Sequence, residues 1–165
     1  METNRGLSAL ARRVGRRLRR ARVLLATAES CTGGWVAQAV TSVAGSSDWF
    51  ERGFVTYSDA AKRDLLGVRR STLRTHGAVS EHTAREMARG ALANSDAGVS
   101  LAVTGVAGPG GGGAAKPVGM VCFAWARGRA VVAETRRFRG GRESVRRQSV
   151  KHALRGVLKL LDAAR

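Results

Sequence analysis

The sequence is poor in several residue types, and each shortage narrows the classes of protein to which the chain can belong. Its two cysteines, Cys31 and Cys122, have no paired spacing, which argues against a disulfide scaffold and for free thiols in a reducing cytosol. Aromatic residues make up only 5%, too few to serve as base-stacking platforms between the basic runs. No apolar run approaches the ~18–20 residues that span a bilayer, and the first twenty residues do not resemble a secretory signal. We therefore expect a soluble, cytoplasmic protein without a membrane partner.

Acidic residues are also scarce, which leaves a large positive charge. The chain has 29 Lys+Arg against 12 Asp+Glu, a net charge of +17, and the basic residues concentrate over 12–22 and 136–159. Such a field attracts anions, whether nucleic acid, a membrane surface or a phosphorylated small molecule. Solvated helix faces in an arginine-rich proteome explain the charge equally well. The charge thus leaves open a non-catalytic basic module that binds nucleotides or nucleic acid.

The chain alternates strands and helices in the manner of an α/β protein. Its 165 residues suit one domain, and 44% hydrophobic residues with 21 glycines suit a compact fold with tight turns. Apolar spacing and turn residues predict helices over 7–21, 33–44, 59–66, 80–94 and 142–163, a short helix or turn over 70–76, and strands over 22–28, 49–57, 99–104, 118–126 and 130–138. We expect a single-domain, three-layer α/β/α sandwich over 1–165, with a mostly parallel but mixed sheet that ends in an antiparallel pair.

The turn after the first predicted strand places Ser30 between a buried strand and a glycine-led helix. Ligands of open α/β sheets lie beyond the carboxyl ends of the strands, where a hydroxyl would lie beside the unpaired N–H groups of a helix start. This position suits a nucleophile next to donors for a developing oxyanion. The alternative, which the local sequence favours by itself, is that Ser30 or Thr32 only caps the helix. Cys31 ranks behind Ser30 as a nucleophile because free cysteines are usually small buried hydrophobes.

Lys62 is the basic residue of most chemical interest. It lies one turn into a helix whose start is expected to face the same cleft as Ser30. A lysine among apolar neighbours loses its proton more easily and can then act as a general base toward a serine. Tyr57, the only tyrosine, ends the preceding strand and is positioned to relay that proton. The alternative for Lys62 is an ordinary residue on a solvent-facing helix surface.

The loop over 105–117 is rich in glycine and connects two predicted strands. Gly108 to Gly113 matches G-x-G-x-x-G only trivially, because it leads to a strand where the dinucleotide fingerprint needs a helix. We expect the loop to line a ligand with its amides or to act as a lid. None of the three histidines, His76, His82 and His152, has a partner at metal-ligand spacing, so we expect no metal and no cofactor.

Six segments closely resemble the CinA C-terminal domain family, and the similarity is collinear from about residue 7 to 162. They are AESCTGG at 28–34, GFVTYS at 53–58, Ala61-Lys62 with LLG at 65–67, HGAVS at 76–80, AVTGVAGPGG at 102–111 and KPVG at 116–119. The resemblance implies a cofactor-free nicotinamide-nucleotide amidase, which converts nicotinamide mononucleotide to nicotinate mononucleotide and ammonia. It also implies Ser30 as nucleophile, Lys62 as general base and Tyr57 as proton relay. The chain is similar to the stand-alone form of the family.

The resemblance further implies a binding site for the nucleotide. Amides near Thr32, Gly33 and Gly34 would hold the oxyanion, and the strand-end motif with Thr104, Gly105 and Gly108 would line the pocket. Arg142 is our candidate for the phosphate, because an arginine can hold phosphate through two hydrogen bonds. We also expect a homo-oligomer, with a dimer favoured. The plain glycine run from Gly110 and the arginine-rich first helix depart from the family pattern and leave the substrate preference open.

Overall fold

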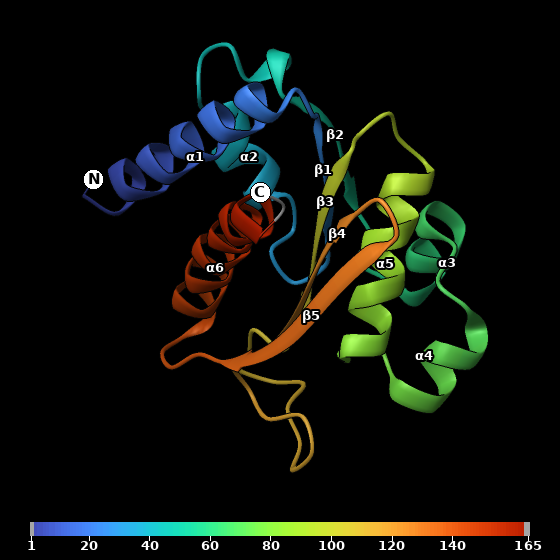
Figure 1. The fold of residues 1–165 in the computed structure, drawn as a ribbon. Coiled ribbons are helices and arrows are strands. Elements are labelled where there is room, and N and C mark those ends of the chain that lie inside the picture. The colour runs from blue at the N-terminus through green and yellow to red at the C-terminus, as the bar shows by residue number, and fades with distance from the viewer. Residues whose placement is uncertain (1, 164–165) are drawn as a thin grey trace.

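The computed structural model describes residues 2–163 and has the three predicted layers (Figure 1). Its elements are α1 (Glu2–Ala21), β1 (Leu25–Glu29), α2 (Trp35–Thr41), a short 3-10 helix η1 (Ser46–Asp48), β2 (Phe50–Val55), α3 (Asp59–Leu66), α4 (Arg70–His76), α5 (Glu81–Ala93), β3 (Val99–Gly105), β4 (Met120–Arg127), β5 (Ala130–Arg137) and α6 (Arg142–Ala163). Helices α1, α2 and α6 cover one face of the sheet, and α3, α4 and α5 cover the other (Figure 1). The predicted α/β/α sandwich is confirmed. Among the described residues, no helix combines the length and the apolar character needed to cross a membrane.

The sheet has five strands in the order β2-β1-β3-β4-β5. β1 pairs in parallel with both β2 and β3, whereas β4 pairs antiparallel with β3 and β5. The mixed sheet with an antiparallel closing pair is therefore as predicted. Because β1, β2 and β3 run in the same direction, the loops that follow them meet at one end of the sheet.

Two apolar clusters fill the two faces of the sheet. The cluster beneath α1, α2 and α6 contains large side chains, including Leu18, Phe123 and Leu154. The cluster beneath α5 consists mainly of alanines from α5, β1, β3 and β4. Small side chains allow α5 to pack close to the sheet, and α3 packs against α5 in turn.

Several element boundaries differ from the predicted ones. α1 begins at Glu2 rather than at residue 7, β1 begins at Leu25 rather than at residue 22, and α2 ends at Thr41 rather than at residue 44.

Two further differences lie next to glycines. α2 begins at Trp35 rather than at residue 33, because Gly33 (φ 58) and Gly34 (φ 96) adopt left-handed backbone conformations. β4 begins at Met120 rather than at residue 118, because Gly119 (φ 90) turns the chain just before the strand. Glycine marked these turns in the sequence but did not fix the residue at which each element begins.

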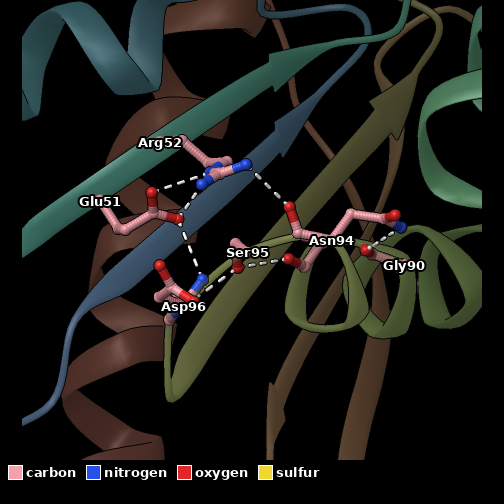
Figure 2. A network of polar contacts seen from close by, with 8 residues as sticks. Glu51, Arg52, Gly90, Asn94, Ser95 and Asp96 are labelled. Carbon is pink, nitrogen blue, oxygen red and sulfur yellow. Dashed lines mark hydrogen bonds and ion pairs between the residues drawn. The ribbon is translucent and has the colours of Figure 1, made fainter.

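A polar network at the amino-terminal end of the sheet ties β2 to the end of α5 (Figure 2). Arg52 pairs with Glu51 (2.6 Å) and donates to the carbonyl of Asn94 (3.1 Å), and Glu51 also accepts from the amide of Asp96 (3.2 Å). The hydrogen bond from Arg52 lowers the pKa of Glu51 below its ordinary value. The network lies at the opposite end of the strands from the loops after β1, β2 and β3, so it supports the sheet rather than the site.

α3 approaches α5 at a glycine, and this contact sets the position of Lys62. A Cβ atom placed on Gly90 of α5 would lie 1.9 Å from the carbonyl oxygen of Leu66, at the end of α3. The atom in the way belongs to the backbone, so a side chain here would force the two helices apart. Gly90 thus allows α3 to lie where Lys62 reaches the end of β1.

We predict that Gly90→Ala lowers the free energy of unfolding by about 1–3 kcal/mol, as other overpacked sites do. Gly6→Ala in α1 is the matched control, because a Cβ atom there meets nothing within 4 Å. Alanine should raise the helix propensity at that position by up to ~1 kcal/mol. Urea denaturation measures both variants, and equal stability of Gly90→Ala and the wild type would contradict the predicted clash.

Candidate active site

The carboxyl ends of β1, β2 and β3 open into a cleft of about 290 Å³. Ser30 directly follows β1, and its amide donates to the carbonyl of Val103 (2.9 Å), which continues the pairing with β3 into the turn. Seven of the ten site residues expected from the sequence line this cleft: Ser30, Tyr57, Lys62, Thr104, Gly105, Gly108 and Arg142. The other three, Thr32, Gly33 and Gly34, are not among its lining residues.

The Lys62 amine lies against the Ser30 hydroxyl. Its Nζ atom is 3.0 Å from Ser30 Oγ and also donates to the carbonyls of Thr56 (2.9 Å) and Tyr57 (3.2 Å). Lys62 is only 1% exposed, so the alternative of a solvent-facing helix residue is wrong. The residue before α3, Ser58, caps that helix by accepting the amide of Ala61 (3.0 Å).

The three contacts of Lys62 Nζ constrain how protons are shared with Ser30. The carbonyls of Thr56 and Tyr57 can only accept, so they take two N–H bonds of the amine. In the neutral amine, the remaining position is a lone pair directed at Ser30 Oγ, which can accept the hydroxyl proton. Burial lowers the pKa of Lys62 below its ordinary value of 10.5, against the smaller opposing effects of Asp59 and Cys31. Both the geometry and the burial suit a general base.

Cys31 does not compete with Ser30 as a nucleophile. Its thiol is buried, and burial raises the pKa of Cys31 to about 12. The thiolate is the reactive form of cysteine, so little of it exists near neutral pH. The environment of Cys31 therefore agrees with its predicted rank behind Ser30 as a nucleophile.

Glu29 caps the start of α2, and neither Ser30 nor Thr32 does. The buried Glu29 carboxyl group accepts the amides of Val36 (2.8 Å) and Ala37 (3.1 Å) and the hydroxyl of Thr32 (2.6 Å). The capping alternative for Ser30 is thus wrong, and its hydroxyl is left to Lys62. Sequence reasoning missed Glu29, although an acidic residue before a glycine-led helix is a signal for such a role.

The amides of the turn are not all free, contrary to expectation. The Gly33 N–H donates to the carbonyl of Ser30 (3.0 Å), so it cannot also hold an oxyanion. Thr32 is fully buried, with its hydroxyl bound to Glu29, and Gly34 serves as the backbone cap of α2. Within residues 2–163, the N–H groups of Cys31, Thr32 and Gly34 have no hydrogen-bond acceptor.

The Tyr57 hydroxyl points toward Arg142 rather than toward Lys62. It accepts from Arg142 Nη2 (3.2 Å), whereas Lys62 contacts only the backbone carbonyl of Tyr57. Tyr57 is 63% exposed and lies at the rim of the cleft. Among residues 2–163, no hydrogen bond joins the Tyr57 hydroxyl to Lys62, so the proton relay expected of this hydroxyl stays a prediction.

Arg142 also holds the glycine-rich loop. Its Nη1 atom donates to the carbonyl of Gly108 (2.7 Å), and Lys116 donates to the carbonyl of His76 from the far side of the loop. The Thr104 hydroxyl donates to the carbonyl of Ala78 (2.8 Å), so this expected pocket residue joins β3 to the α4–α5 connection. The loop is thus fixed to both sides of the cleft.

The histidines take no part in this cleft. His76 and His82 stack with their ring centres 3.6 Å apart, and His152 is hydrogen-bonded to Glu134. Across residues 2–163, no group of three or more His, Cys, Asp or Glu side chains is arranged to hold a metal ion. The polar side chains that line the cleft include those of Ser30, Tyr57, Lys62, Thr104 and Arg142.

These observations define an α/β/α protein with a buried serine–lysine pair at the carboxyl ends of its parallel strands. The model of the CinA C-terminal domain matches residues 7–161. The chain belongs to the CinA C-terminal domain family.

Named relatives and solved structures agree with this assignment. The chain is 53% identical over 154 residues to the nicotinamide-nucleotide amidohydrolase PncC of Pseudomonas putida, covering 93% of this chain and 96% of that protein. It is 51% identical to the protein of the same name from Escherichia coli (strain K12), covering 92% and 93%. The crystal structure of the competence/damage inducible protein CihA from Agrobacterium tumefaciens superimposes with a TM-score of 0.90 at 48% identity, covering 94% of this chain and 95% of that one.

Lys62 should make the stability of the protein depend on pH. Because its pKa is lowered in the folded state, the unfolded chain binds more protons between that lowered value and 10.5. The free energy of unfolding of the wild type should therefore rise with pH across this window. The free energy of unfolding of Lys62→Met, relative to the wild type, should fall over the same window. Urea denaturation at several pH values measures the difference.

Lys159→Met, which removes an exposed amine on α6, is the control and should show no such trend. A difference between Lys62→Met and the wild type that stays constant with pH would contradict the lowered pKa of Lys62.

Proposed function

We propose that this protein is a nicotinamide-nucleotide amidohydrolase that deamidates nicotinamide mononucleotide to nicotinate mononucleotide and ammonia. The observation that carries the proposal is the buried Lys62 amine, 3.0 Å from the Ser30 hydroxyl at the mouth of the cleft. The names of two relatives that are more than 50% identical over nearly the whole chain support this choice of substrate.

In the first half of the reaction, Ser30 Oγ attacks the carboxamide carbon while the Lys62 lone pair takes the hydroxyl proton. An O–C bond forms, and the carboxamide oxygen becomes an oxyanion. The oxyanion then collapses, the C–N bond breaks, and Lys62 returns the proton to the departing nitrogen. Ammonia leaves, and the nicotinate group remains as an ester on Ser30.

In the second half, water attacks the ester carbon and gives a proton to Lys62. The bond between carbon and Ser30 Oγ breaks, and Oγ regains its proton from Lys62. Nicotinate mononucleotide leaves, and the pair returns to its starting state. Each proton is held by Lys62 between two successive transfers, so neither half needs the Tyr57 hydroxyl as a relay.

The nucleotide would lie between the serine turn and the glycine-rich loop. Arg142 is our candidate for the phosphate, since its guanidinium lies at the rim and can exchange its contacts with Gly108 and Tyr57 for phosphate oxygens. Thr104 and Gly105 would shape the floor of the cleft. We further propose that the protein works as a homo-oligomer in the cytoplasm.

The alternative of a basic nucleic-acid-binding module finds no support in this cleft. The exposed arginines of α1 lie on a helix that contributes no lining residue. α1 also ends beside the amino-terminal end of β1, away from the loops that form the cleft (Figure 1). The charge of α1 is therefore independent of the proposed reaction.

We predict that purified protein releases ammonia from nicotinamide mononucleotide without added metal, and that Ser30→Ala abolishes release. Lys62→Met should lower kcat by at least ~10³-fold, because the variant lacks the base for both half-reactions. Lys159→Met should release ammonia with the kcat of the wild type. A coupled ammonia assay decides the question, and full turnover by Ser30→Ala would overturn the proposal.

Arg142→Gln should raise KM for nicotinamide mononucleotide by about 10–100-fold, because a charge-assisted contact to the phosphate is lost. The same variant should change little with nicotinamide riboside, which lacks the phosphate. Arg139→Gln, in the exposed connection just before α6, serves as the matched control. Equal losses with the nucleotide and the riboside would show that Arg142 does not bind the phosphate.

A further inference from the structure

Arg146 of α6 reaches across the fold and holds the turn that carries Ser30. Its Nε atom donates to the carbonyl of Cys31 (3.0 Å), and its Nη2 atom donates to the carbonyl of Thr32 (3.0 Å). The guanidinium also lies over the Trp35 ring, 5.4 Å from its centre. One half-buried cation thus binds two successive peptide groups, more than 110 residues away in sequence.

These contacts fix three successive peptide groups after Ser30. The C=O and N–H of one trans peptide point in opposite directions, so holding the Cys31 carbonyl also directs the Thr32 N–H away from α6. Holding the Thr32 carbonyl directs the Gly33 N–H, which donates to the Ser30 carbonyl (3.0 Å). That last bond in turn fixes the peptide whose N–H belongs to Cys31. Arg146 therefore sets the orientation of the whole turn.

In this turn the N–H groups of Cys31, Thr32 and Gly34 have no acceptor among residues 2–163, and this arrangement orients the first two. Of the three residues, only Cys31 lines the cleft. The nearby donors of Val36 and Ala37 are already bound by Glu29. The amide of the residue after a nucleophilic serine is a common oxyanion donor in α/β enzymes. In a chain of hydrogen bonds each bond also polarises the next, so a cation at one end strengthens the donor at the other.

We propose that Arg146 is a positioning residue, which orients and polarises the amide of Cys31, a residue that lines the cleft, so that this amide stabilises the oxyanion formed on attack by Ser30. The inference rests on the proposed function, since it names the groups that serve the same reaction. It assigns Arg146 no contact with the substrate. Loss of Arg146 should therefore affect the transition state far more than substrate binding.

Arg147 provides a matched control on the same helix. Its guanidinium lies 5.5 Å from the centre of the same Trp35 ring, but its hydrogen bond goes to Glu143 and not to the turn. Arg146→Met and Arg147→Met thus remove the same charge and the same type of ring contact. They differ in whether the carbonyls of Cys31 and Thr32 lose their donors.

Steady-state kinetics with nicotinamide mononucleotide test the proposal. Arg146→Met should lower kcat about 100-fold with KM within about threefold of the wild type, as expected when oxyanion donors are misplaced. Arg146→Lys keeps the charge and one donor nitrogen in place of the two that bind the turn, so its kcat should fall between those of the wild type and Arg146→Met. Arg147→Met should have a kcat and a KM within about threefold of the wild-type values. A kcat of Arg146→Met equal to that of Arg147→Met, or a rise in KM alone, would overturn the proposal.

A second measurement separates this inference from the proposed function. A fluorophosphonate probe reacts when Ser30 Oγ bonds to phosphorus, fluoride leaves and Lys62 takes the hydroxyl proton, with the P=O oxygen in the oxyanion position. Intact mass spectrometry gives the labelling rate, and Ser30→Ala identifies the site. Arg146→Met should label about 100-fold more slowly than Arg147→Met, and equal rates would overturn the inference.

The combined outcomes are distinct. A wild type that labels at Ser30 but deamidates no nicotinamide nucleotide would refute the proposed function, while the labelling rates would still decide the role of Arg146. A wild type that neither labels nor turns over would refute both. Should Arg146→Met fail to fold by circular dichroism, Arg146→Lys decides, and a rate equal to the wild type would overturn the inference.

Discussion

The arrangement of this protein depends on a single buried amine. Lys62 is 1% exposed, yet its Nζ atom has three oxygen neighbours, two backbone carbonyls and the Ser30 hydroxyl. Burying an amine is costly unless its hydrogen bonds are satisfied, so the site requires β2, α3 and β1 to meet with little tolerance. The Ser58 cap and the close approach at Gly90 serve this requirement, because both fix α3 against its neighbours.

The two faces of the sheet contribute different parts of the site. The proposed base, Lys62, comes from α3 on one face, whereas the serine turn is supported from the other face by Glu29, which caps α2, and by Arg146 of α6. The glycine-rich loop closes the cleft between them through Arg142. Lys62, the proposed proton acceptor, is thus held by α3, and the backbone donors of the serine turn are held by contacts with α2 and α6.

The sequence was sufficient for features that follow from local patterns. Apolar periodicity and turn residues predicted the order of elements and the closing strand pair, and the motifs led to Ser30 and Lys62. The cap at Glu29 had a local signal, an acidic residue before a glycine-led helix, but the direction of the Tyr57 hydroxyl and the reach of Arg146 were not predictable in this way. Each of these two features is a contact between groups that lie far apart in the sequence and meet only in the packed fold. Such contacts leave no periodic pattern in the sequence.

The proposed reaction needs a neutral Lys62 amine with its lone pair toward Ser30, and titration of this amine measures whether its pKa is lowered. The chain has only four lysines, so NMR of ¹³C-labelled lysine side chains can follow each one, with Lys62→Met to assign the signal. Lys62 should titrate below 10.5 in the folded protein, and this lowered pKa should persist in Ser30→Ala because burial causes it. A Lys62 signal that titrates at 10.5 or above would rule out the lowered pKa and, with it, the proposed base.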